Sequence, residues 1–251
     1  MEDSIKYGQM DFNLPHDVVT LPSQGKFYKN KKKSLKVGYL TAQDENIMVS
    51  AGKVDNLLHT LVRNKIYEPN FKLEDLLESD LEAILIFLRN TAFGPDYTFN
   101  LVDPKTNKEY QKTIQLDRLE ILEPKHEPNS DGFFEFTLPK TNDNVLCKLL
   151  TVGETEELNK STKNYPSGVI APVVTNKLSA HIISINGNED RSYISQYVNN
   201  LPISDSKYLR NYISDCEPRL NLEREVETPS GEKVTIRVAF GVEFFRPFFW
   251  T

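Results

Sequence analysis

Apolar residues recur at helical spacing in several parts of the chain. The clearest stripe runs from Leu81 to Leu88. Ser79 and Glu82 have the spacing of a capping box, and Gly94-Pro95 ends the run. This pattern predicts one long helix between residues 79 and 94. Similar periodicity predicts further helices over residues 41–51, 56–66, 151–163, 191–199 and 205–215.

Other segments alternate apolar and polar residues, which is the period of a strand. Residues 97–102 and 110–116 alternate on either side of a turn at 103–108, and residues 222–228 and 233–240 do so around a turn at 229–232. Each pair predicts a β-hairpin. Further strands are expected at residues 27–28, 35–40, 133–138, 145–150 and 178–185, while residues 165–175 are predicted to be irregular. Helices mixed with β-hairpins predict an α+β fold.

The order of these segments recurs along the chain. Leu40-Thr41 returns as Leu150-Thr151, and Ser79-Asp80 returns as Ser204-Asp205. Pro104 and Pro229 in the two hairpin turns are separated by the same 125 positions as the two Ser-Asp pairs. Because both dipeptides are common, chance is the competing explanation. We interpret the recurrence as an internal duplication. It predicts a first α+β unit at 1–123, a linker at 124–132 rich in turn formers, and a second α+β unit at 133–251.

Composition restricts the class of protein. Lys and Arg total 30 against 36 Asp and Glu, so the net charge is −6, and 39% of residues are apolar. Such a chain can form a core, and its acidity argues against a general nucleic-acid binder. The longest apolar run, residues 83–88, is too short to span a membrane, and residues 1–6 do not resemble a signal peptide. With only Cys147 and Cys216, neither a disulfide framework nor a metal cage is expected.

Candidate catalytic chemistry is sparse. The chain has no glycine-rich phosphate loop, and its four histidines lack a partner at metal-ligand spacing. Glu154, Glu156 and Glu157 offer paired carboxylates for acid–base catalysis, but acids at a helix start also favour the helix dipole. The hairpin turns carry no thiolates for zinc, and the lysine-rich run 29–33 is interpreted as a solvated hairpin tip rather than a phosphate site. No catalytic, cofactor or metal residue is predicted.

The chain closes on an aromatic C-terminal tail, residues 244–250. One interpretation is a last strand whose alternate residues enter the core, with Phe244 and Phe248 inward and Phe249 and Trp250 outward. The other is an anchor for a partner protein, because large aromatics and Arg dominate binding hot spots. The partner-binding candidates are Phe244, Phe245, Arg246, Pro247, Phe248, Phe249 and Trp250.

Several short motifs together resemble a known family. They are Leu21-Pro22-Ser23-Gln24-Gly25, Leu40-Thr41-Ala42-Gln43-Asp44-Glu45, Leu76-Leu77-Glu78-Ser79-Asp80 leading into Phe87-Leu88-Arg89-Asn90-Thr91-Ala92-Phe93-Gly94, and the ending Phe244-Phe245-Arg246-Pro247. The chain resembles the baseplate hub assembly proteins of contractile-tailed phages of the T-even type.

This resemblance implies a non-enzymatic role in building the baseplate hub, as an assembly chaperone or as a minor hub component. The implied partners are other phage baseplate hub proteins, met in the cytoplasm of the infected bacterium, with no nucleic acid, membrane or cofactor involved. A structural subunit of the virion baseplate is one alternative. A carboxylate-based cell-wall hydrolase is an alternative of another class.

Overall fold

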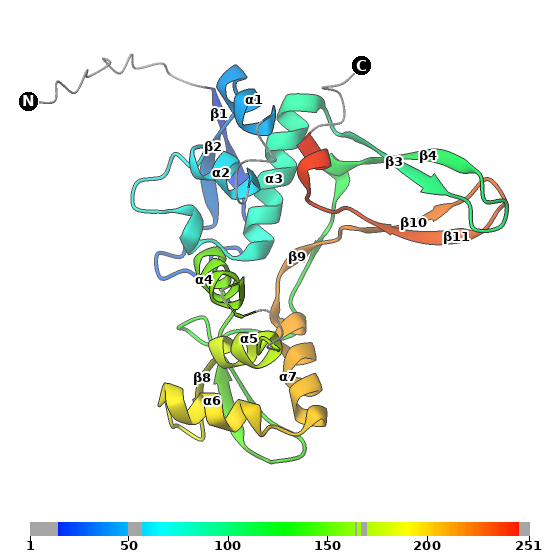
Figure 1. Cartoon of the computed structure of the whole chain (residues 1–251). Helices are drawn as coiled ribbons and strands as arrows, with labels where there is room; N and C mark the ends of the chain where they lie inside the picture. Colours follow the sequence, from blue (N-terminus) through cyan, green and yellow to red (C-terminus); the bar gives the residue numbers. More distant parts are fainter. Residues whose placement is uncertain (1–14, 50–56, 164, 167–169, 246–251) are drawn as a thin grey trace, which may run out of the picture.

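The computed structural model describes residues 15–49, 57–163, 165–166 and 170–245. Figure 1 shows two helical bodies, one above the other, and an arm of two β-hairpins that projects from the upper one. Separate small antiparallel sheets and several helices confirm the predicted α+β fold. Among the described residues, no helix has both the length and the apolar character needed to span a membrane.

The first body is built around α3 (Glu78–Phe93), the long helix that the sequence predicts. Its predicted stripe from Leu81 to Leu88 is largely buried, and Gly94 ends the helix with a φ of 79°, which glycine adopts without strain. A two-stranded antiparallel sheet and three shorter helical segments pack around it. These are β1 (His16–Thr20), β2 (Ser34–Gly38), α1 (Ala42–Val49), α2 (Leu57–Arg63) and the 3₁₀ turn η1 (Leu73–Asp75).

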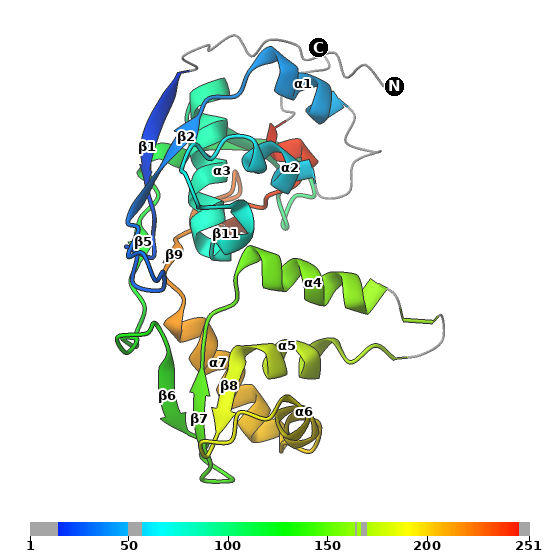
Figure 2. The same cartoon turned by 90° about the vertical axis from the view of Figure 1, so that its left-hand side faces the viewer.

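The second body has an antiparallel sheet of three strands in the order β6-β7-β8. Helices pack beside this sheet (Figure 2), and Leu178, Ile194 and Leu209, which lie on three of them, bury their side chains in the core. The elements are β6 (Phe134–Thr137), β7 (Asn144–Cys147), α4 (Val152–Lys163), α5 (Val173–His181), β8 (Ile182–Ile185), α6 (Arg191–Asn199) and α7 (Ile203–Cys216).

The arm consists of two hairpins that are far apart in the sequence. Their tips meet where the Asp103 carboxylate, fully buried, accepts hydrogen bonds from the Ser230 backbone N–H and hydroxyl at 3.0 Å each. The hairpin strands are β3 (Asp96–Val102), β4 (Glu109–Gln115), β10 (Glu223–Glu227) and β11 (Lys233–Arg237). The 3₁₀ turns η2 (Leu116–Arg118) and η3 (Val242–Phe245) lie at its base, and β5 (Ile121–Leu122) pairs with β9 (Arg219–Leu220) below it.

Helix α4 joins the two bodies. The Val152 N–H at its start donates to Leu76 O at 2.7 Å, and Gly153 approaches η1 so closely that a Cβ there would lie 2.9 Å from the Cβ of Glu74. One turn further on, the Glu156 carboxylate contacts the imidazole Nδ1 of His59 in α2. The bodies therefore meet through close backbone packing, which leaves no room for a side chain at position 153.

A buried carboxylate occupies the first turn of the long helix in each body. Asp80 in α3 accepts a hydrogen bond from the Ser23 N–H at 2.9 Å and another from the Tyr28 hydroxyl. Asp205 in α7 accepts from two successive backbone amides, those of Lys140 and Thr141, at 3.0 Å each. Both carboxylates thus hold the turn that follows a Leu-Pro pair. This equivalence supports the predicted duplication, which stays a prediction.

Most sequence-predicted elements are confirmed. Both arm hairpins and the helices expected over 151–163, 191–199 and 205–215 appear within three residues of their predicted limits. The helix expected over 56–66 is shorter, at Leu57–Arg63. Residues 123–133, which include the predicted linker, contain no helix or strand. The division into two units at that linker stays a prediction. After Cys216 the chain returns to the first body, where it forms β9, the second hairpin of the arm and η3.

Three local predictions are wrong. The strand expected over 178–185 is a strand only over 182–185, because residues 173–181 form α5. A short apolar run is compatible with both the helical and the strand period, and Pro172 is the N-cap residue of the helix. Phe27 and Tyr28 lie in consecutive turns, not a strand. The Ser79–Glu82 capping box is absent, since Leu77 is the N-cap residue and its N–H donates to the Tyr28 hydroxyl at 3.0 Å.

We expect Asp80→Ala to lower the free energy of unfolding by about 2–4 kcal/mol, because it leaves a buried amide and a buried hydroxyl without an acceptor. Asp80→Asn keeps one acceptor oxygen and should cost less. The comparison is Asp190→Ala, which removes the N-cap of α6 and should cost about 1 kcal/mol. Urea unfolding followed by circular dichroism measures all three. Equal costs for Asp80→Ala and Asp190→Ala would contradict the role assigned to Asp80.

Candidate interaction surface

The structure divides the aromatic C-terminal tail. Phe244 and Phe245 are fully buried in the first body, where the Phe244 ring lies 5.5 Å from that of Tyr97. The Arg89 guanidinium lies 5.1 Å from the Tyr97 ring centre and 5.9 Å from that of Phe244, and donates to Gly94 O and Asp96 O. Phe244 and Phe245 are therefore core residues with no exposed surface for a partner. The remaining candidates, Arg246, Pro247, Phe248, Phe249 and Trp250, lie outside the described residues.

One group of exposed apolar side chains lies near the start of α5. Ile170 is 94% exposed, Val173 is 53% exposed and Val174 is 50% exposed. In Figure 2, α4 and α5 extend side by side away from the sheet, so these residues lie toward the outer end of a helical pair. Three exposed aliphatic side chains within five positions differ from the single scattered ones that any protein surface carries.

A hollow of about 350 Å³ lies beside them, between α5 and α7. Leu178 and Ile213, both buried, contribute apolar surface to it, and Val173 and Val174 line it from the start of α5. Its charged lining residues are Lys177, Arg210 and Glu217, and it is also lined by His181 and Ser214. We call this hollow the α5–α7 groove. The sequence does not predict this groove, because the pattern over residues 165–175 indicates irregular structure. Pro172, directly before Val173, is the signal that favours a helix start there.

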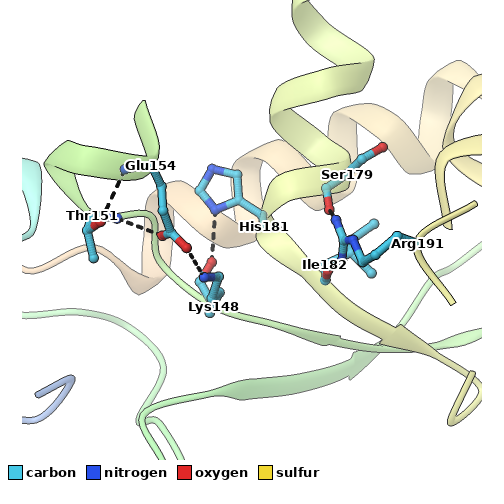
Figure 3. Close-up of polar contacts among 7 residues, drawn as sticks. All are labelled: Lys148, Thr151, Glu154, Ser179, His181, Ile182 and Arg191. Carbon is cyan, nitrogen blue, oxygen red and sulfur yellow. Dashed lines mark hydrogen bonds and ion pairs between the residues drawn. The ribbon is translucent and has the colours of Figure 1, made fainter. Parts of the chain in front are cut away.

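Polar contacts hold the C-terminal end of α5 in place (Figure 3). The His181 Nδ1 lies 2.8 Å from Lys148 O, and the Lys148 N–H donates to His181 O, also at 2.8 Å. Burial lowers the pKa of His181 to about 4. The imidazole is therefore neutral at pH 7, so that its Nδ1–H donates to the carbonyl, and it does not act as an acid or base near neutral pH.

The neighbouring charges in Figure 3 are also occupied in structural contacts. The Arg191 guanidinium donates to Ile182 O at 2.6 Å and to Ser179 O, and so satisfies carbonyls at the end of α5. Glu154 caps α4 by accepting from the Thr151 N–H at 3.1 Å, and it also pairs with Lys148. These contacts thus hold the C-terminal end of α5, the helix that forms one wall of the α5–α7 groove.

The acidic residues considered for catalysis have structural partners. Glu154 is a helix cap, and Glu156 pairs with His59 between the two bodies. Cys147 and Cys216 are buried free thiols, and burial raises the pKa of both, which disfavours the reactive thiolate. Within the part of the chain that the structure describes, no group of three or more His, Cys, Asp or Glu residues could hold a metal ion.

The lysine-rich run 29–33 is partly tied down. Lys32 pairs with Glu68 at 2.7 Å, and the Lys31 ammonium donates to Ser130 O at 3.1 Å. Lys26, just before the run, pairs with Glu127 at 2.9 Å. Contacts to acids and to the segment before β6 thus account for part of this charge.

A carboxylate with a shifted pKa lies on α3 at the base of the arm. Half-buried Glu82 loses hydration there, and the charges of Glu217 and Glu78 add repulsion, which Arg237 and Arg219 only partly offset. These effects raise the pKa of Glu82 to about 7. Ionising Glu82 therefore costs more free energy in the folded protein than in the unfolded chain.

A family model described as T4 bacteriophage base plate protein matches residues 15–246. No curated protein and no solved structure matches the chain.

We expect Glu82→Gln to stabilise the protein at pH 8 by about 1–2 kcal/mol, since each pKa unit corresponds to about 1.4 kcal/mol and partial exposure reduces the effect. Because the folded-state pKa lies above the unfolded one, wild-type stability falls as the pH rises from about 4.5 to about 7, relative to the Gln variant. The difference should vanish near pH 4. Urea unfolding across this range measures it, with exposed Glu120→Gln as the control. A pH-independent difference would contradict the assignment.

Proposed function

Because the chain belongs to the T4 bacteriophage base plate protein family, we propose that it helps to assemble the baseplate hub by binding other baseplate hub proteins. The proposed role is non-enzymatic, as a chaperone or as a minor hub component, and the proposed place of action is the cytoplasm of the infected bacterium. The family itself supports a baseplate protein. The binding role is the finer step that we add.

One observation carries this proposal: the exposed aliphatic residues at the start of α5 border a preformed groove. Leaving Ile170, Val173 and Val174 exposed to water is unfavourable for an isolated protein, and contiguous apolar surface is typical of sites that a partner covers. The carboxylates that suggested a hydrolase provide less support for that alternative, because Glu154 and Glu156 are occupied in structural contacts.

Co-expression with each of the other baseplate hub proteins of the same phage tests binding. We expect the chain to co-purify with at least one of them through affinity capture and size exclusion. Deleting residues 246–251 should weaken that complex at least tenfold if the aromatic C-terminal tail is an anchor, and it leaves Phe244 and Phe245 in the core.

The two parts of this test fail separately. No complex with any hub protein would contradict the binding proposal. Unchanged affinity in a stably folded deletion variant would contradict only the anchor role of Arg246 to Trp250.

Mass spectrometry of purified phage particles distinguishes a chaperone from a retained subunit. A minor hub component, or a structural subunit of the virion baseplate, should be present in stoichiometric amounts in every particle. A chaperone should be present in the lysate of infected cells and absent from the particles. Absence from both would contradict a role in assembly during infection.

A further inference from the structure

The α5–α7 groove combines an apolar floor with a border of charged residues. Leu178 and Ile213 are 3% and 6% exposed and form part of its floor, while Val173 and Val174 keep about half of their surface in water. Its volume of about 350 Å³ is within the range of roughly 300–1,000 Å³ that is typical of pockets that bind ligands. Several apolar side chains of a partner can therefore enter it without any change in the fold.

The charges at this groove are unbalanced. Lys177 and Arg210 are cationic, and Glu217, which is close enough to Lys177 to be affected by its charge, is the one carboxylate in the lining. The Arg210 Nε donates only to Ser206 O of its own helix at 3.3 Å, and no carboxylate among the described residues pairs with Arg210. On a protein of net charge −6, the groove is thus a local cationic site with an available guanidinium.

We propose that the α5–α7 groove binds a short amphipathic helix of another baseplate protein, with apolar side chains against Val173 and Val174 and a carboxylate paired with Arg210. Arg binds carboxylates through two parallel hydrogen bonds, and Arg is enriched at protein–protein interfaces relative to the rest of the surface. This inference rests on the proposed function, because it names the surface and the chemistry of the partner.

A helix fits this groove better than an extended strand does. Both walls are helices, whose backbone N–H and C=O groups already bond within the helix, so they cannot extend a sheet. The nine residues of α5 span about 13 Å, which matches two to three turns of a partner helix. Anchors three or four positions apart on that helix would lie on one face, with an Asp or Glu at its edge.

Point variants test the groove in the complex with the hub protein that co-purifies. We expect Val174→Asp and Arg210→Glu each to weaken the complex roughly tenfold or more, since each removes a central contact and adds like charge to an acidic partner face. Val18→Asp is the control for Val174, because Val18 is 63% exposed on β1 and lies opposite Lys36. Lys207→Glu is the control for Arg210, being exposed on the same helix outside the groove. Both controls should bind as wild type, and thermal unfolding confirms that all four variants are folded.

A photo-crosslinking residue at position 174 identifies the occupant. The expected product joins the chain to a hub-protein peptide with apolar residues at helical spacing and a nearby Asp or Glu. Replacing that acid by Arg should weaken binding to the wild-type chain and restore binding to Arg210→Glu.

Four results would overturn the groove proposal while the proposed function stands. The first two are a complex whose affinity is unaffected by Val174→Asp and Arg210→Glu, and an equal loss of affinity in the matched controls. The third is a crosslinked peptide without an acidic residue. The fourth is self-association of the chain that Val174→Asp abolishes, which would make a second copy the occupant. A chain that binds no hub protein at all would overturn the proposed function as well.

Discussion

The buried carboxylate in the first turn of each long helix is the interaction on which the architecture depends. Asp80 and Asp205 accept hydrogen bonds from the backbone turn that follows a strand, so each attaches a sheet to the start of a helix. An acid is favourable there because of the helix dipole, and the buried amides require an acceptor. In this way the two contacts set the direction of α3, which carries the arm, and of α7, which forms one wall of the α5–α7 groove.

The two bodies are linked by a few specific contacts, not by a continuous sheet. Gly153 allows α4 to pack directly on η1, and the two-residue strands β5 and β9 pair where the chain leaves and re-enters the first body. The groups near this junction include Glu78, Glu82 and Glu217, whose like charges are brought together by the packing. The junction thus combines tight backbone approach with an electrostatic cost.

Local pattern was sufficient to predict the α+β class, both hairpins and most helices, because these depend on periodicity and turn residues. It failed where distant residues decide the structure. Tyr28 lies in a turn rather than in the predicted strand, and its hydroxyl donates a hydrogen bond to Asp80. Phe244 packs in the core against Arg89 and Tyr97, which are far from it in the sequence. The groove could not be predicted, since Val173 and Arg210 come together only through the packing of α5 beside α7.

The contact between Asp103 and Ser230 joins residues 127 positions apart. The β3–β4 hairpin leaves the ribosome long before its partner, so for most of translation its inner face has no second hairpin to pack against. The arm closes only after the whole second body has been synthesised and the chain has returned. A finished arm is therefore a structural sign that synthesis has passed β11, and a chain terminated before that strand would lack it.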